Sequence, residues 1–350
     1  MKFLILTLIL LLGAFTASAE RITDFGAVPN DGISDAQAIQ DALASVEQGC
    51  GGEVVIPKGE FLVDDTIATN FSHCGWLHLT LRGEPGAELR ISTTSQITFI
   101  MSSLLSLQVK DITFLGVNVA PPNSAFYDAS MVFQVFSVGT AVFDHVNFYG
   151  LAVTQSMIRA LNTNLTVTHA QFSGSLATYP DGAYILGDKD TSGNGWQSIT
   201  VNECEFIDYV NYKTGYLNKT PYVLTGAYIR TTAPNPGGAA RTRGKLEVRN
   251  STFDEGANAS IVATDTPYVV VSEVAINLNI GTNATGIRLT NVESAEVDRS
   301  IGDWAAGYFI TTNNVTRVRV SLLTMKAGAH FWRNLGHTYL VQGWCPGCDP

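Results

Sequence analysis

Five short segments of the sequence carry arginine and aromatic residues at matching positions, where such side chains could hold a ligand. The segments are GAYILGD (182–188), GAYIRTT (226–232), TGIRLTN (285–291), GYFITTN (307–313) and HFWRNLG (330–336). Each has the pattern of a short strand with a central apolar residue facing inward. The pattern predicts that the central residues face the core. They are Ile185, Ile229, Ile287, Phe309 and Phe331, together with Ile261 of a sixth segment.

The residues that flank these central positions are expected to face outward, because side chains alternate along a strand. They include Tyr184, Tyr228, Tyr308, His330, Trp332, Arg230 and Arg288, and the strand SMIRALN (156–162) adds Arg159. Aromatic rings stack on sugar faces, and guanidinium groups bind carboxylates through paired hydrogen bonds. We therefore expect an outer groove that binds a glycan, with uronic glycans among the candidates. The alternative is an ordinary solvated sheet face.

Two kinds of reaction fit the residues in and beside these segments. Glycoside hydrolysis generally uses two carboxyl groups about 5 to 9 Å apart. Asp181 and Asp254 are the candidate pair, since two strand spacings would separate them by about 10 Å. A lyase or epimerase instead needs a cation that stabilises a uronate enolate and a group that moves the proton. Arg230 and Arg288 are catalytic candidates of that type, with Tyr228 and His330 beside them, and the choice between these reactions stays open.

One segment has the beginning of a calcium loop. In DKDTSGNG, Asp188 and Asp190 alternate ahead of a glycine, as ligands do in such loops. The twelfth position is Ile199 instead of glutamate, so a plain turn is favoured over a calcium site. We expect no cofactor and no other metal.

The elements that position these residues recur along the chain. The segments LQVKDITF, AVFDHVNF, LTVTHAQF, ITVNECEF, LEVRNSTF, VVVSEVAI and VRVSLLTM begin at residues 107, 141, 165, 199, 246, 269 and 318. A degenerate copy, AEVDRSIG, begins at residue 295, so the shortest steps in this series are 23 to 26 residues, and the longer ones add an insertion. Two or three short strands in so short a unit, without helices, predict the coils of a parallel β-helix, which bury their inward side chains by stacking.

The start of the chain supplies a cover for the first coil. Ser34 and Gln37 are spaced as a capping box, and Ile39, Leu43 and Val46 form one apolar stripe of a short helix. The ends of a β-helix expose unpaired strand edges that need covering. We expect this helix to cap the amino-terminal end.

The opening segment also resembles a known superfamily. The residues that carry the resemblance are Asp24-Phe25-Gly26-Ala27, Asn30-Asp31-Gly32, Asp35, Ala38-Ile39 and the stretch GGEVVIPKG (51–59). They are similar to the pectate lyase superfamily of right-handed parallel β-helices, which includes polygalacturonase-like hydrolases and phage tailspike depolymerases. The resemblance implies an all-β, single-stranded right-handed parallel β-helix that acts on polysaccharide. Of the polygalacturonase motifs only Asp181-Gly182 is present, so Asp181 is the single position carried over.

The first 19 residues have the features of a secretory signal peptide. Lys2 precedes an apolar run from Phe3 to Phe15, and Ala17-Ser18-Ala19 provides a small-residue cleavage site. We expect a secreted, extracellular protein with one β-helix domain over residues 20–350. Within it we expect an amino-terminal cap at about 20–50, coils at about 51–340 and a carboxy-terminal cap at about 341–350.

Five cysteines in an exported chain allow two disulfides and one free thiol. Cys50 and Cys74 lie near each other in sequence, as do Cys345 and Cys348, and we expect these two pairs to be bonded. Cys204 occupies an inward position of its coil and is expected to be free and buried.

Charge narrows the range of partners. The formal net charge is −10, which argues against nucleic acid and anionic membrane but permits an anionic polysaccharide on a locally basic surface. The leading hypothesis is a secreted polysaccharide hydrolase or lyase. Its alternative is a catalytically inactive glycan-binding or cell-surface β-helix protein. The sequence does not indicate the sugar, the linkage or the oligomeric state.

Overall fold

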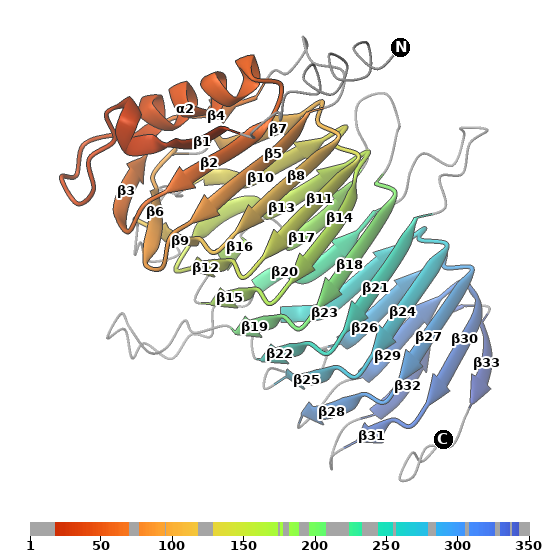
Figure 1. Ribbon diagram of the computed structural model, residues 1–350. Helices are drawn as coiled ribbons and strands as arrows, with labels where there is room; N and C mark the ends of the chain where they lie inside the picture. Colours follow the sequence, from red (N-terminus) through yellow and green to blue (C-terminus); the bar gives the residue numbers. More distant parts are fainter. Residues whose placement is uncertain are drawn as a thin grey trace, which may run out of the picture.

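The protein is a right-handed parallel β-helix, seen in a computed structural model as a stack of coils that follow the sequence from one end to the other (Figure 1). Its strands form three parallel sheets. The short strand β16 (Leu176–Ala177) lies beside the main order of the 11-stranded sheet and pairs with β13. The structure describes residues 18–69, 77–94, 96–117, 129–173, 176–177, 182–188, 196–207, 224–232, 244–254, 257–278, 285–304, 308–325, 330–336 and 338–342.

The 12-stranded sheet begins at the amino-terminal cap. Its strands are β1 (Ser18–Arg21), β2 (Gly52–Ile56), β5 (His78–Gly83), β8 (Ser106–Lys110), β11 (Thr140–Asp144), β14 (Asn164–Thr168), β18 (Ser198–Asn202), β21 (Lys245–Arg249), β24 (Tyr268–Ser272), β27 (Ser294–Asp298), β30 (Val315–Ser321) and β33 (Thr338–Gln342).

The 10-stranded sheet follows it along every coil. Its strands are β3 (Gly59–Val63), β6 (Ala87–Ile91), β9 (Thr113–Gly116), β12 (Asn147–Tyr149), β15 (Gln171–Ser173), β19 (Glu205–Ile207), β22 (Thr252–Asp254), β25 (Ala275–Leu278), β28 (Ile301–Trp304) and β31 (Thr324–Met325).

The 11-stranded sheet completes each coil and carries the candidate site. Besides β16 its strands are β4 (Ile67–Ala68), β7 (Ile97–Ser102), β10 (Ala129–Phe136), β13 (Ala152–Leu161), β17 (Ala183–Asp188), β20 (Leu224–Thr231), β23 (Ala257–Thr264), β26 (Thr285–Thr290), β29 (Tyr308–Asn313) and β32 (His330–Asn334).

Stacked aromatic rings fill the interior along the 10-stranded sheet. Phe114, Phe148, Phe172, Phe206 and Phe253 are fully buried, and consecutive ring centroids lie 4.7–5.0 Å apart. Each phenylalanine pairs in register with its counterpart on the next coil. The repeated phenylalanine of the sequence therefore becomes one continuous core, which no coil could build alone.

A left-handed residue marks the corner between the 12-stranded and 10-stranded sheets on successive coils. The residues with positive φ at this corner are Asp111, His145, His169, Glu203, Asn250, Glu273, Arg299 and Leu322. Each directly follows the last residue of a strand in the 12-stranded sheet. The repeated turn stacks the side chains of this corner from coil to coil.

The helix α2 (Ala36–Gln48) covers the first coil, as expected, together with the short 3₁₀ helix η1 (Ile22–Phe25) (Figure 1). Ile39, Leu43 and Val46 are buried, so the predicted apolar stripe is confirmed. The predicted capping box is wrong. Asp35 is the residue at the amino-terminal cap of α2, and Gln37 contacts Asp41 instead of closing a box.

The Asp35 carboxylate links the turn cluster before the helix to strand β3 through hydrogen bonds. It accepts hydrogen bonds of 3.0 Å from the backbone N–H groups of Val28 and Leu62. These bonds join the turn cluster before the helix to strand β3, which lies on the first coil. The turn residues at the start of the chain thus anchor the cap to the cylinder.

The predicted leader lies almost wholly outside the described residues. Ser18 and Ala19, which precede the expected cleavage point, pair with Gly52 and Glu53 as part of β1. Cleavage there would leave Glu20 and Arg21 as the remaining residues of this strand, and the signal peptide stays a prediction. In the described residues no helix has the length and apolar character needed to cross a bilayer.

Candidate functional site

The outer face of the 11-stranded sheet carries a regular array of arginines. Strand register aligns Arg159, Leu186, Arg230, Val262, Arg288, Thr311 and Arg333, which we call the arginine column. Arginine therefore occurs on every second strand from β13 to β32. Because parallel strands lie about 4.8 Å apart, consecutive arginines of the column are about 10 Å apart along the sheet.

The outward direction of the column follows from its neighbours. Val262 clusters with Ala227 and Ala259 in an apolar group separate from the main core. Ala227 and Ala259 pair with each other in the next outward row, which continues through Thr285 and Tyr308 to His330. The predicted outward orientation of Arg159, Arg230 and Arg288 agrees with this arrangement.

Tyr184 and Tyr228 do not belong to the outer face, and their predicted orientation is wrong. Both side chains are fully buried. The ring of Tyr184 lies 5.9 Å from that of Phe172, and the ring of Tyr228 lies 5.5 Å from that of Phe206. Their predicted inward neighbours Ile185 and Ile229 are buried as well, so two successive residues enter the core on each strand.

A repeated irregularity in strand pairing accounts for these double inward positions. Ala183 pairs with Ala227 and Ile185 with Ile229, while the tyrosines between them are skipped. The same skip recurs between β29 and β32, where Tyr308 pairs with His330 and Ile310 with Trp332. A local break in the ladder bends a strand and redirects a side chain. Both residues after the break can then face the core.

Trp332 is also misassigned to the outer face. Register places it opposite Ile310 in the inward row, where it is partly buried and packs against the core. Its indole Nε1–H donates a 3.0 Å hydrogen bond to the Thr312 hydroxyl. Phe309 and Phe331, predicted to be inward, are buried. The ring set predicted to bind sugar is therefore reduced to Tyr308 and His330.

Tyr308 and His330 form a compact group with Arg333, which the sequence interpretation missed. The rings of Tyr308 and His330 stack with centroids 5.3 Å apart. The guanidinium carbon of Arg333 lies 5.3 Å from the centroid of the Tyr308 ring. His330 and Arg333 are exposed, so this group combines a proton carrier and a cation on the surface. His330 and Arg333 are three residues apart, so simple alternation would place them on opposite faces of the strand. They share the outer face because both residues between them, Phe331 and Trp332, face the core.

Arg159 is neutralised within the protein. Its Nη2 lies 2.6 Å from Oδ2 of Asp188, whose Oδ1 accepts a 3.0 Å hydrogen bond from the Thr232 hydroxyl. Both carboxylate oxygens of Asp188 thus contact protein donors. A calcium ion that bound Asp188 would have to displace the guanidinium of Arg159. Asp190, the other residue of the predicted calcium loop, lies outside the described residues.

Arg288 lies in a different electrostatic environment. Partial burial lowers the pKa of Arg288, and the positive charge of Arg230 lowers it further. Within the described part of the chain, no acidic side chain forms an ion pair with Arg288. A partly buried guanidinium beside a second cation, as Arg288 is, favours the binding of an anion to it.

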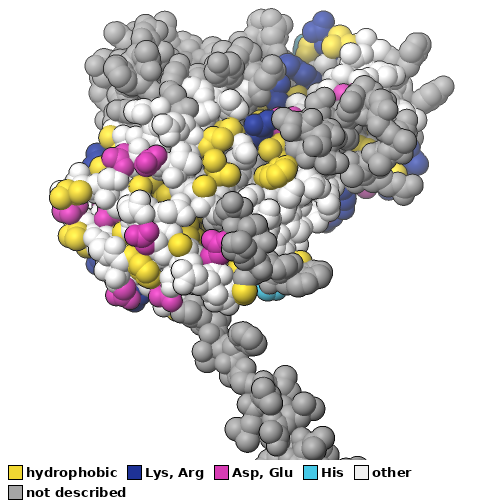
Figure 2. Space-filling model, turned by 90° about the horizontal axis from the view of Figure 1, so that it is seen from above, with side chains coloured by type: hydrophobic (Ala, Val, Ile, Leu, Met, Phe, Trp, Pro, Cys, Tyr) yellow, Lys and Arg dark blue, Asp and Glu magenta, His cyan; other side chains and the backbone are white. Residues whose placement is uncertain are grey.

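The distribution of charge on the visible surface is uneven. Figure 2 shows acidic side chains (magenta) scattered over its left side, whereas most of the visible Lys and Arg atoms (dark blue) lie toward its upper right. The formal net charge of −10 therefore coexists with locally basic surface.

The structure describes one member of the predicted carboxylate pair. Asp254 ends β22, at the turn that leads into the 11-stranded sheet, and its backbone carbonyl accepts a 2.9 Å hydrogen bond from the Tyr228 hydroxyl. Asp181 lies outside the described residues. The catalytic pairing of Asp181 with Asp254 therefore stays a prediction.

The structure describes two of the five cysteines, Cys50 and Cys204. Cys204 is free and buried, as predicted, and burial raises the pKa of its thiol to about 12. Cys50 is disulfide-bonded. Cys74, Cys345 and Cys348 lie outside the described residues, so the two predicted pairs stay predictions.

One group of side chains with metal-binding chemistry occurs in the described residues. Asp144, His145 and His169 place one potential ligand atom each within 4.8 Å of the others. They lie at the corner between the 12-stranded and 10-stranded sheets, away from the arginine column. The sequence interpretation missed this group, although a histidine in each of two consecutive repeat copies was a visible signal.

Comparison with known proteins identifies the fold. No protein-family model and no curated protein matches the sequence. Among solved structures, PfbA, a surface adhesin of Streptococcus pneumoniae, is similar over 93% of both chains, with 15% identity and a TM-score of 0.58. The Agl-KA catalytic domain is similar over 93% of this chain and 69% of its own, with 13% identity and a TM-score of 0.55. At this identity the similarity shows the parallel β-helix fold.

Proposed function

We propose that this protein is a secreted glycan-binding protein that holds an acidic polysaccharide along the arginine column. The observation that carries the proposal is the environment of Arg288. This guanidinium is partly buried next to Arg230, and Arg288 itself has no acidic partner in the described residues. A carboxylate of the ligand would supply the missing counter-charge through a charge-assisted hydrogen bond.

The regularity of the column supports a polymeric ligand. Arg230, Arg288 and Arg333 recur at intervals of about 10 Å on the rigid strands β20, β26 and β32. A polymer with carboxylates at regular intervals can contact several such cations at once, and each contact strengthens the others by raising the effective concentration. The fold similarity to a surface adhesin is compatible with a binding role.

Polysaccharide cleavage is the second candidate function, and Tyr308, His330 and Arg333 are the observation that favours it. Eliminative cleavage of a uronic polymer needs a group that removes the proton and a cation that stabilises the resulting charge. His330 and Tyr308 are of the first type, and Arg333 is of the second. The fold similarity to the Agl-KA catalytic domain is compatible with an enzyme.

Isothermal titration with a polyuronate and with a neutral glucan of similar length tests the binding proposal. We expect Arg288→Gln to weaken polyuronate binding about 10–100-fold, the equivalent of one charge-assisted hydrogen bond. The matched control is Arg319→Gln, which removes the same charge from an exposed position of β30 in the 12-stranded sheet. Equal losses in both variants, or equal binding of the neutral glucan, would contradict the proposal.

The same polymers distinguish binding from cleavage. New reducing ends together with the ultraviolet absorbance of a new double bond would indicate a lyase, and reducing ends alone would indicate a hydrolase. If cleavage occurs by elimination, His330→Asn should abolish it while Arg288→Gln chiefly raises KM. Binding without either product supports the binding protein.

A further inference from the structure

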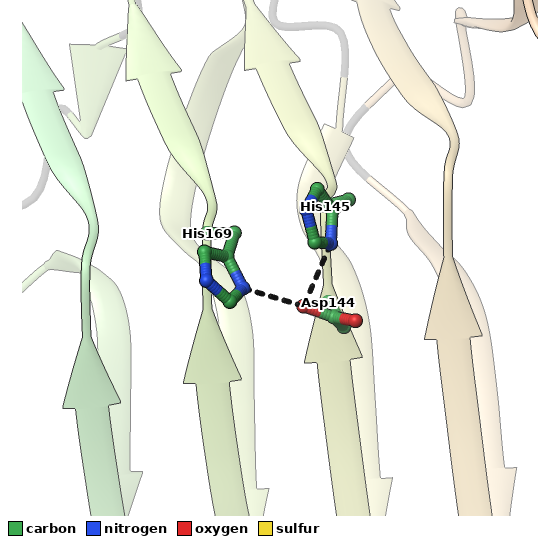
Figure 3. A group of neighbouring side chains, drawn as sticks. All are labelled: Asp144, His145 and His169. Carbon is green, nitrogen blue, oxygen red and sulfur yellow. Dashed lines mark hydrogen bonds and ion pairs between the residues drawn. The ribbon is translucent and has the colours of Figure 1, made fainter.

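The corner between the 12-stranded and 10-stranded sheets carries a cluster that the glycan proposal does not use. Oδ1 of Asp144 lies 2.9 Å from Nδ1 of His145 and 3.0 Å from Nδ1 of His169. Figure 3 shows the two imidazoles on neighbouring coils, both directed toward the same carboxylate. Three potential ligand atoms from two coils therefore converge on one point.

The backbone holds both histidines in place independently of any ligand. His145 and His169 have φ values of 52° and 49°, in the left-handed region of the repeated corner. Their N–H groups donate hydrogen bonds to the carbonyls of Thr168 and Asn202 on the following coil. The rings consequently stack with centroids 4.4 Å apart, one coil above the other.

An outer carboxylate completes the arrangement. Nε2 of His169 lies 2.8 Å from Oε2 of Glu203, on the opposite side of the ring from Asp144. Histidines that bind metals almost always donate their other ring N–H to such an acceptor, which sets the tautomer and makes the ligand nitrogen more basic. With Nε2–H of His169 donating to Glu203, loss of the Nδ1 proton on metal binding would leave the Nδ1 electron pair for an ion beside Asp144.

We propose that Asp144, His145 and His169 form a binding site for a divalent transition-metal ion of the Zn²⁺ class, oriented by Glu203. Two imidazole nitrogens and one carboxylate oxygen are a ligand set that Zn²⁺ accepts, and they leave a fourth position open to water. Ca²⁺ is a poor occupant because it takes six to eight oxygen ligands. The site lies outside the arginine column, so it is independent of the proposed glycan binding.

The distances require small adjustments. Ligand atoms of a tetrahedral Zn²⁺ lie roughly 3.4 Å apart, and the two Nδ1–Oδ1 distances are 2.9 and 3.0 Å. The two ring planes make an angle of 21°, so at least one imidazole must turn to direct its lone pair at a shared ion. The side chains of His145 and His169 are 58% and 42% exposed, which leaves room for that rotation.

A metal held in this way would connect two coils. Asp144 ends β11 and His145 follows it, whereas His169 follows β14, and these strands are neighbours in the 12-stranded sheet. A ligand that binds the folded state and not the unfolded chain stabilises the fold by RT ln(1 + [L]/Kd), where [L] is the free ligand concentration. The melting temperature Tm should therefore rise with Zn²⁺ concentration.

Titration of the untagged, metal-free protein with ZnCl₂, followed by calorimetry and equilibrium dialysis, tests the site. We expect one Zn²⁺ per chain and a Tm that rises with Zn²⁺. His145→Asn and His169→Asn should each remove this equivalent, and asparagine tolerates the left-handed backbone at these positions. Glu203→Gln should weaken binding about 10–100-fold without abolishing it, as expected for an outer-shell partner.

The control variant is His78→Asn, which removes an exposed histidine bonded to Ser106 on another part of the same sheet. It should retain the full stoichiometry and the Zn²⁺-dependent rise in Tm. A wild-type protein that retains no Zn²⁺ would overturn the proposal. Binding that survives both His145→Asn and His169→Asn would overturn it as well, and so would equal competition by Ca²⁺.

Discussion

The 12-stranded and 11-stranded sheets belong to the same coils, yet they bury their side chains by different rules. In β14 of the 12-stranded sheet, Leu165 and Val167 are buried while the residues between and beside them are partly exposed. In β17 of the 11-stranded sheet, five successive residues from Ala183 to Gly187 are buried. Alternation describes the first sheet from β5 to β21 and fails for β17 of the second.

The difference arises from the break in strand pairing at the tyrosine position. Where the ladder is continuous, neighbouring side chains must point to opposite faces. Where it skips Tyr184 and Tyr228, two successive side chains turn toward the core. An outer face inferred by simple alternation is therefore reliable on the 12-stranded sheet and shifted for part of the 11-stranded sheet.

The largest expected effect tests the double inward step directly. Tyr184→Ala should lower the free energy of unfolding by about 3–5 kcal/mol and Ile185→Ala by about 2–5 kcal/mol, because both leave cavities in a packed core. Chemical denaturation measures both values. Full stability of either variant would show that the residue faces solvent and would restore simple alternation.

The 12-stranded sheet supplies the contrasting pair. Leu165→Ala should cost about 2–5 kcal/mol, because it removes a buried side chain. Thr166→Ala, one residue away and partly exposed, should stay within about 0.5 kcal/mol of the wild type. Comparable losses in both variants would remove the difference between the two sheets.

A smaller effect concerns the hydroxyl of a buried tyrosine. Tyr228→Phe keeps the ring in the core but removes the 2.9 Å hydrogen bond to the Asp254 carbonyl. We expect a loss of about 0.5–1.5 kcal/mol in the free energy of unfolding, typical of one such bond. A surface location of Tyr228 would instead make the variant neutral.

The smallest effect compares the outer faces of the two sheets. On β21 of the 12-stranded sheet, partial burial by itself raises the pKa of Glu247, but hydrogen bonds from Lys245 and Arg249 outweigh it, and the pKa lies below its usual value. The carboxylate therefore stabilises the fold above its unfolded pKa of about 4.3, and this contribution is lost as the pH falls through the lower folded pKa.

Thermal unfolding at a series of pH values measures this contribution. The Tm difference between wild type and Glu247→Gln should shrink as the pH falls below about 4. A difference that is constant across this range would show that the ion pairs of Glu247 contribute nothing. The arginine column has no matching acidic partner at Arg288 in the described residues, so its outer face lacks this kind of stabilisation.

Much of the fold could be predicted from the sequence because its repeats are local. Recurring segments such as AVFDHVNF and LTVTHAQF indicated coils of a short repeating unit with insertions, and Phe148 and Phe172, which end these two segments, stack in the core. The apolar stripe of the capping helix could likewise be recognised from the spacing of its residues. A repeat that must pack on its own copies leaves its periodicity in the sequence.

The candidate site was predictable only in part. Arg159, Arg230 and Arg288 were correctly placed in one outward column because their spacing from Ile158, Ile229 and Ile287 is the same. Arg333 and the true position of Trp332 were missed, because the alignment of the last coils was displaced by one residue. Nothing in a single strand reveals which of two adjacent apolar residues lies opposite its partner on the next coil.

The sequence by itself determined the coil repeat, the inward phenylalanines and the amino-terminal cap, because each depends on short-range periodicity. Only the tertiary structure decided that Tyr184 and Tyr228 are core residues, that Asp188 neutralises Arg159 but not Arg288, and that His145 and His169 converge on Asp144. These are contacts between residues on neighbouring strands and coils. Strand register and the bend in the ladder set them, and neither property is encoded in the order of residues within one repeat.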